Sequence, residues 1–136
     1  MTTYKIEEVE GVGPAYAAKL QAAGVSTTDD LLAKGASPKG RADLEAATGI
    51  SHSLLLEWVN HVDLMRLDGV GSEFSDLLEA AGVDSPAELA QRNAANLAQT
   101  FQELNAARAT VRRVPSEEVI TGWIKQAKTL PKIVEH

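Results

Sequence analysis

The chain of 136 residues contains no cysteine, which excludes disulfide bonds, thiolate zinc sites and cysteine nucleophiles. Only six residues are aromatic, so a core has to be built mainly from Leu, Val, Ile and Ala. No apolar run approaches the roughly 18 residues that a membrane-spanning helix needs, and the first ten residues are polar and acidic, unlike a secretory signal. We therefore expect a cytoplasmic protein that makes no contact with a membrane.

The chain is 44% hydrophobic and rich in alanine, a composition that favours helices around an aliphatic core. Its formal net charge is −6, which does not suit a strong general binder of nucleic acids. The charge is uneven, because residues 1–107 carry 7 basic and 16 acidic side chains, whereas residues 108–136 carry 6 basic and 3 acidic ones. A polyanion is therefore expected to bind at the C-terminal third.

The sequence repeats itself. Residues 10–25 (EGVGPAYAAKLQAAGV) match residues 68–83 (DGVGSEFSDLLEAAGV) with eight identities in sixteen positions. Trp58 and Trp123 occupy equivalent places later in the two halves. We infer an internal duplication, in which residues 1–136 form a single domain made of two repeats, about 1–63 and 64–131, because each half alone is small for a stable core.

Local signals predict helices throughout, and no segment alternates between apolar and polar residues over five or more positions as a strand would. A left-handed Gly24 and its counterpart Gly82 are expected to end one helix in each half. The expected helix starts are Pro14, Ser26 or Thr27, Ser37-Pro38, Ser51, Ser85-Pro86, Asn93 and Ser116. The fold class predicted is all-α, an internally duplicated helical domain.

Each half begins with a frame of apolar residues around a Gly-Val-Gly turn. The first frame is Ile6, Val9, Gly11, Val12, Gly13, Ala17 and Leu20, and the second is Leu64, Leu67, Gly69, Val70, Gly71, Ser75 and Leu78. Two glycines allow a tight turn between helices, and such a turn presents backbone amides at a helix N-terminus, where the dipole favours anions.

Both frames resemble the helix-hairpin-helix (SAM-like) motif. In the families of this kind that bind DNA, the hairpin contacts the backbone without reading the sequence. The resemblance implies phosphate contacts at the amides of Gly11, Gly13, Gly69 and Gly71. The alternative is a purely structural hairpin, which Pro14 and the acidic neighbours Glu10 and Asp68 favour.

Over nearly its whole length the chain is similar to a family of small, functionally uncharacterised prokaryotic proteins built from tandem helix-hairpin-helix motifs. The stretches that carry the likeness are EGVGPAYAAKLQAAGV, LLAKGASPKGRADL, WVNHVDLMRLDGVG, AELAQRN and VRRVPS. The resemblance implies the fold, whereas the family's own label is one of unknown function.

Basic side chains supply further candidate contacts to a nucleic acid. Lys39 and Arg41 stand at an expected helix start, where the alternative is a solvated loop. The main basic patch is expected from Arg108, Arg112, Arg113, Lys125 and Lys128, with Lys125 and Lys128 on one helix face. Lys125 and Lys128 are equally suited to interact with a helix C-terminus as ordinary dipole partners.

No catalytic motif is found, and the chain is not expected to be an enzyme or to hold a cofactor. His52 and His61 make a poor metal pair, so no metal is expected, and both tryptophans are predicted to pack in the core. The prediction is a non-catalytic module that binds DNA or RNA weakly through its backbone. The alternative is a protein-protein interaction or scaffold module with structural hairpins.

Overall fold

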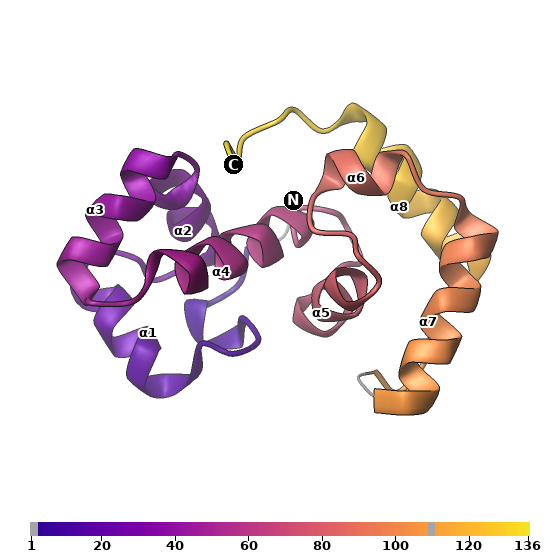
Figure 1. Ribbon diagram of the computed structural model, residues 1–136, viewed down its shortest axis with the longest axis horizontal. Coiled ribbons are helices and arrows are strands. Elements are labelled where there is room, and N and C mark those ends of the chain that lie inside the picture. Colours follow the sequence, from indigo (N-terminus) through magenta and orange to yellow (C-terminus); the bar gives the residue numbers. More distant parts are fainter. Residues whose placement is uncertain (1–2, 109–110) are drawn as a thin grey trace. The chain divides into compact units, whose positions relative to one another are not determined.

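The computed structural model describes residues 3–108 and 111–136, which form eight α-helices, one short 3-10 helix and no strand within these ranges (Figure 1). The predicted all-α class is thus confirmed. The elements in chain order are η1 (Ile6–Glu8), α1 (Gly13–Ala22), α2 (Thr28–Gly35), α3 (Pro38–Thr48), α4 (His52–Leu64), α5 (Ser72–Ala80), α6 (Pro86–Ala90), α7 (Ala94–Arg108) and α8 (Glu117–Thr129).

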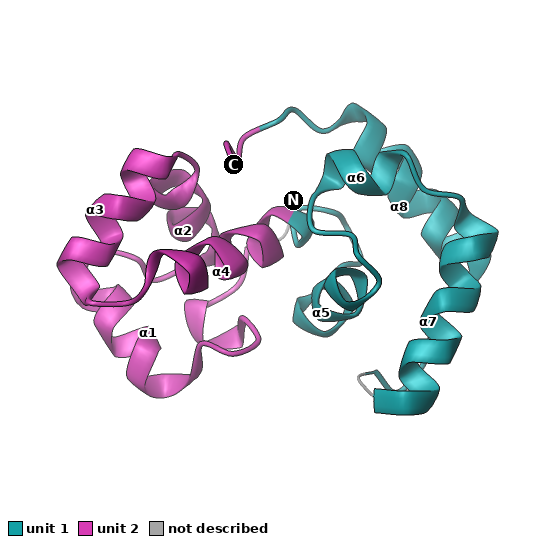
Figure 2. Ribbon diagram, in the orientation of Figure 1, with its two compact units in different colours: residues 1, 64–132 teal, residues 2–63, 133–136 magenta. Residues whose placement is uncertain are grey.

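The chain divides into two compact units, shown in different colours in Figure 2. The N-terminal unit contains residues 3–63 together with Ile133–His136, and the C-terminal unit contains Leu64–Lys132. The boundary between Asp63 and Leu64 falls where the sequence placed the end of the first repeat. The joining of the last four residues to the N-terminal unit was not foreseen, and the packing of both repeats as one domain stays a prediction.

Side-chain caps begin six of the helices, at the positions that the sequence predicts. In each case a side-chain oxygen accepts a hydrogen bond from the backbone N–H three residues later, which satisfies one of the unpaired donors of a helix start. Of the two candidates for α2, Thr27 rather than Ser26 is the cap. The donor–acceptor distances are 3.0–3.3 Å for Thr27, Ser37, Ser51, Ser85, Asn93 and Ser116.

The helices α1 and α5 end in the same way, in a Schellman motif closed by a left-handed glycine. Gly24 follows α1 with φ 88°, and the Val25 N–H donates to the Leu20 carbonyl at 2.8 Å. Gly82 follows α5 with φ 89°, and the corresponding bond, from Val83 to Leu78, is 2.9 Å long. Both predicted helix ends are confirmed.

Each unit has its own aliphatic core with one tryptophan in it. In the N-terminal unit the first turn η1 is held by the Ile6 N–H, which donates to the Ser26 carbonyl at 3.0 Å, and Ile6 itself is fully buried. In the C-terminal unit α8 packs against α6 and α7. The buried cluster there is Leu64, Leu67, Val70, Leu77, Leu78, Val83, Leu89, Leu97, Phe101, Val111, Ile120, Trp123, Ile124 and Ala127.

The Thr27 cap gives a direct test of the start of α2. Replacing Thr27 with Ala removes the oxygen that accepts the Asp30 N–H, and the free energy of unfolding should fall by about 1 kcal/mol. Ser26→Ala is the matched control, since the Ser26 side chain is exposed and does not cap the helix. Equal losses for the two variants in urea denaturation followed by circular dichroism would contradict the assignment of the cap.

Asp30 adds a pH dependence to the same turn. The backbone N–H groups of Ser26 and Thr27 donate to its carboxylate at 3.0 and 3.1 Å and hold the pKa of Asp30 below its ordinary value. A lowered folded-state pKa contributes stability above the unfolded pKa of about 3.9, and this is lost as pH falls through the folded value.

We therefore expect Asp30→Asn to lower the unfolding free energy at pH 7, with a difference from the unchanged protein that shrinks below about pH 4. Urea denaturation at both pH values measures it. Asp29→Asn is the control in the same turn, and a difference for Asp30→Asn that stays constant with pH would refute the linkage.

Candidate nucleic-acid interface

The first glycine hairpin lies between η1 and α1, with its backbone at the surface. Gly11 and Gly13 are exposed and have φ values of 89° and 64°, which side chains other than glycine rarely adopt. Between them Val12 is 2% exposed, and its N–H donates to the Val9 carbonyl at 3.1 Å. The side chain of Val12 thus enters the core, while Gly11 and Gly13 on either side of it face solvent.

The second hairpin, before α5, repeats part of this geometry. Gly69 is exposed with φ 89°, Val70 is fully buried, and the Val70 N–H donates to the Leu67 carbonyl at 3.1 Å. Gly71 differs, because its φ of −95° is open to any residue. The sequence attributes the tight turn to both glycines, but here only Gly69 has a positive φ, and Gly71 serves as the N-cap residue of α5.

Each frame has one small residue on the helix after its hairpin, and both of these residues are buried. Ala17 on α1 is 2% exposed, and Ser75 on α5 has no exposed surface. The Ser75 hydroxyl is satisfied locally, donating to the Ser72 carbonyl at 2.8 Å. Ser75 is therefore accommodated in this buried position without leaving its hydroxyl donor unpaired.

A tryptophan lies against each hairpin. An ideal Cβ on Gly11 would lie 3.5 Å from Nε1 of Trp58, and one on Gly69 would lie 3.2 Å from Nε1 of Trp123. Trp58 also meets Tyr16 edge-on, with ring centroids 5.1 Å apart. The two tryptophans are 1% and 3% exposed, so their predicted place in the core is confirmed. Their contact with the glycines was missed, although their equivalent positions in the two halves were a signal for it.

Acidic groups and local bonds reduce the anion-binding capacity of the hairpins. Glu10 and Asp68, each directly before the first glycine of its hairpin, are exposed, and so is Glu73 in the first turn of α5. The Asp68 N–H donates to Oε1 of Gln126 on α8 at 2.9 Å, so this amide is already satisfied. The donors that remain for an anion are those of the glycines and of the first helical turns.

Arg41 departs from its predicted role. It is only 1% exposed, because the C-terminal residues cover it. Its guanidinium donates to the carbonyls of Gly35 at 2.8 Å, Ala36 at 3.2 Å and Glu135 at 2.7 Å. Burial lowers the pKa of Arg41, and the nearby Glu135 carboxylate opposes that shift. In this structure the side chain holds the C-terminal residues in place and is not available to a nucleic acid.

The segment that covers Arg41 is extended and anchored at several points. Val134 is 1% exposed, and the Glu135 N–H donates to the Ala36 carbonyl at 2.7 Å. The His136 ring lies 2.9 Å from Oδ1 of Asn60 on α4. The last four residues thus contribute an apolar side chain and backbone hydrogen bonds to the N-terminal unit.

The other basic candidates are exposed, but they are dispersed. Lys39 forms a 3.1 Å ion pair with Asp43, and both side chains are largely in water. Arg108 ends α7 and Arg112 and Arg113 precede α8, whereas Lys125 and Lys128 lie in its second half. The rise from Glu117 to Lys125 is about 12 Å, with Glu117 and Glu118 between the groups. The basic residues therefore form one group before α8 and another in its second half, and a single basic patch stays a prediction.

The N-terminal unit also contains a pocket of about 320 Å³, lined by Ala23, Lys34, Gly40, Asp43, Leu44 and Ala47. Its two charges are already engaged. Lys34 donates to the Ala23 carbonyl at 3.4 Å, and Asp43 pairs with Lys39. The pocket therefore shows no preference for a ligand of either sign.

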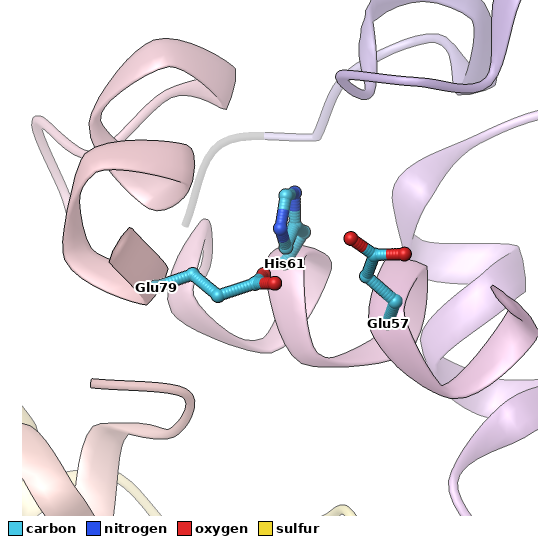
Figure 3. A group of neighbouring side chains, drawn as sticks. All are labelled: Glu57, His61 and Glu79. Carbon is cyan, nitrogen blue, oxygen red and sulfur yellow. The ribbon is translucent and has the colours of Figure 1, made fainter. Parts of the chain in front are cut away.

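Glu57 and His61 lie one turn apart on α4 (Figure 3). Figure 3 also draws Glu79, which belongs to α5 in the C-terminal unit. A catalytic zinc site takes three protein ligands and a structural one takes four. Neither unit by itself supplies more than two of these three residues, which is fewer than either kind of zinc site needs.

The chain belongs to the family described as a domain of unknown function (DUF4332), whose pattern it matches over residues 10–130. No curated protein and no solved structure matches the chain significantly. None of the helices that the structure describes combines the length and the apolar character needed to cross a bilayer. Membership of this family does not indicate an activity.

The buried guanidinium of Arg41 predicts a large effect on stability. Arg41→Met leaves three carbonyls without their charged donor, and the free energy of unfolding should fall by about 2 kcal/mol. Lys39→Met is the matched control, because an exposed ion pair contributes under about 1 kcal/mol. The free energies of unfolding are measured by urea denaturation. Removing Ile133–His136 should lower this free energy by much of the amount that Arg41→Met does. A neutral Arg41→Met would show that the C-terminal contacts carry no stability.

Proposed function

We propose that the chain is a non-catalytic tandem helix-hairpin-helix module that binds the backbone of DNA or RNA weakly and without sequence preference. One observation carries the proposal. At the starts of α1 and α5 stand two glycine hairpins, each with an exposed first glycine at φ 89° and a buried valine. Backbone amides at a helix start suit phosphate oxygens and carry no information about base sequence.

Paired local details support an origin by duplication. The cap at Thr27 has its counterpart 58 residues later at Ser85. The Schellman motifs at Gly24 and Gly82 are separated by the same interval. A long basic side chain bonds a backbone carbonyl at each of these helix ends, Lys34 at 3.4 Å and Arg92 at 3.1 Å. These contacts recur although the residues that make them differ.

The charge distribution sets the expected strength of binding. Arg108, Arg112 and Arg113 are exposed on the C-terminal unit and are free to neutralise phosphates there. The overall charge of −6 and the acidic residues beside the hairpins oppose the approach of a polyanion. Weak binding, strongest at low ionic strength, is the result expected from this balance.

A protein-interaction module is the second candidate, and the hairpin surroundings favour it. Exposed Glu10, Asp68 and Glu73 lie beside the hairpins, where they would attract basic side chains of a partner. The bond from the Asp68 N–H to Gln126 also indicates a purely structural use of the second hairpin. On this alternative the hairpins hold helices together and the acidic surface is the binding face.

The first candidate predicts salt-sensitive binding that depends on the arginines before α8. In fluorescence anisotropy with labelled mixed-sequence duplex and single strands, affinity should fall linearly with salt on logarithmic axes. Arg112→Glu with Arg113→Glu should weaken binding by at least about tenfold at low salt. The double variant should also lower the slope by roughly 0.9 for every phosphate that the protein no longer neutralises.

The matched control is the double reversal of Lys19 and Lys34, two exposed lysines outside the candidate contacts that change the net charge equally. Equal losses of affinity for the two double variants would mean that only net charge matters, which contradicts the assigned contacts. If no binding occurs even at low salt, the nucleic-acid proposal fails and the protein-interaction candidate takes its place.

A further inference from the structure

The two indole nitrogens occupy the same place in the two units, at the surface glycine that begins each hairpin. Nε1 of Trp58 lies 3.5 Å from where a Cβ of Gly11 would stand, and Nε1 of Trp123 lies 3.2 Å from that of Gly69. In both units an indole N–H, rather than a carbon edge of the ring, is the nearest group to the hairpin glycine. The two units therefore place the same kind of donor beside the first glycine of each hairpin.

Neither indole N–H has a hydrogen-bond acceptor among the residues that the structure describes, although the two side chains are 1% and 3% exposed. An indole nitrogen can only donate, and neither nitrogen is among the described side-chain atoms that are both buried and without a partner, so an acceptor from solvent can reach each one. Buried tryptophans usually find a partner for this group. Each unit therefore presents one indole donor that an acceptor from outside the chain can reach.

The glycines keep these donors accessible. A side chain at Gly69 would place its Cβ within 3.2 Å of the indole nitrogen, closer than nearly all ordinary contacts of a Cβ, and so would cover it. Gly11 and Gly69 are themselves exposed. A ligand atom that reaches the hairpin backbone thus comes within reach of the indole N–H as well.

We propose that the indole N–H groups of Trp58 and Trp123 are phosphate-oxygen donors, each completing an anion site formed by the hairpin amides. The site in the N-terminal unit is Gly11, Gly13 and Trp58, and that in the C-terminal unit is Gly69, Gly71 and Trp123. The inference rests on the proposed function and names the side chain that holds the phosphate. The anion follows from position, since each hairpin leads into a helix of nine or ten residues whose positive dipole end faces the site.

The protein has only two tryptophans, so its proton–nitrogen correlation NMR spectrum should contain two indole Nε1–H signals. Titration of the whole chain with sodium phosphate should shift both signals saturably. Sodium chloride at equal ionic strength should not shift them, because chloride cannot match the geometry of a tetrahedral oxyanion. The same signals should shift with an unlabelled mixed-sequence duplex at low salt.

Trp58→Phe and Trp123→Phe each remove one donor and keep an aromatic ring in the core. Each should abolish one indole signal, leave the phosphate response of the other, and weaken duplex binding by about tenfold. Tyr4→Phe is the control, an aromatic substitution away from both hairpins that should leave the affinity unchanged. Circular dichroism confirms the fold of each variant, and the direct phosphate titration of the unchanged protein tests the donors even where a variant fails to fold.

The outcomes separate this inference from the proposed function. If the duplex binds while both indole signals stay unmoved, the tryptophans are core residues only and the inference falls, whereas nucleic-acid binding stands. If phosphate moves the signals and no duplex binds, the anion sites stand and the proposed function falls. If neither ligand has an effect, both are overturned.

Discussion

The positive φ of the first glycine in each hairpin is the constraint on which each unit depends. A residue other than glycine at Gly11 or Gly69 would have to adopt φ near 89°, and at Gly69 its Cβ would also stand 3.2 Å from the ring nitrogen, closer than most Cβ contacts. Because glycine meets both conditions, the turn can lie on the tryptophan while Val12 or Val70 enters the core beside it. The helix that follows is then fixed at its start, and its other end is closed by a second glycine. The first glycine of each hairpin thus determines both the start of the helix that follows and the burial of the valine beside it.

The sequence predicts the helix ends well because their chemistry is local. A serine, threonine or asparagine oxygen reaches the N–H three residues on, and a glycine ends a helix wherever its left-handed backbone is favoured. The start at Ser116 and the stop at Gly82 both follow from such short-range rules. Where two neighbouring hydroxyls were equally suited, at Ser26 and Thr27, only the structure distinguishes them. The same local logic fails at Gly71, since a Gly-Val-Gly turn does not show which of its glycines needs positive φ.

Interactions between distant residues lie beyond this kind of prediction. Arg41 follows a proline and a lysine at a helix start and has the pattern of a surface cation, but its partner Glu135 is 94 residues away. Nothing in the last four residues marks them as a covering segment, because they are held by one buried valine and by hydrogen bonds of Glu135 and His136 to distant residues. The basic residues around α8 show a related limit. Their clustering along the chain is visible, whereas the start of α8 between Arg113 and Lys125 becomes certain only in the structure.

The proposed anion sites consist of neutral donors. At the proposed sites the anion would meet backbone amides and an indole N–H, with no lysine or arginine directly before or between the glycines of either hairpin. Neutral donors position a phosphate without displacing condensed counterions, so the salt dependence of binding would come from the C-terminal arginines and lysines alone. The hairpins and the basic groups would then have separable effects, the first on affinity at every ionic strength and the second on its slope. Trp58 and Trp123 would allow the hairpins to act on affinity alone, because a buried indole ring gives a fixed donor without adding charge beside Glu10 and Asp68.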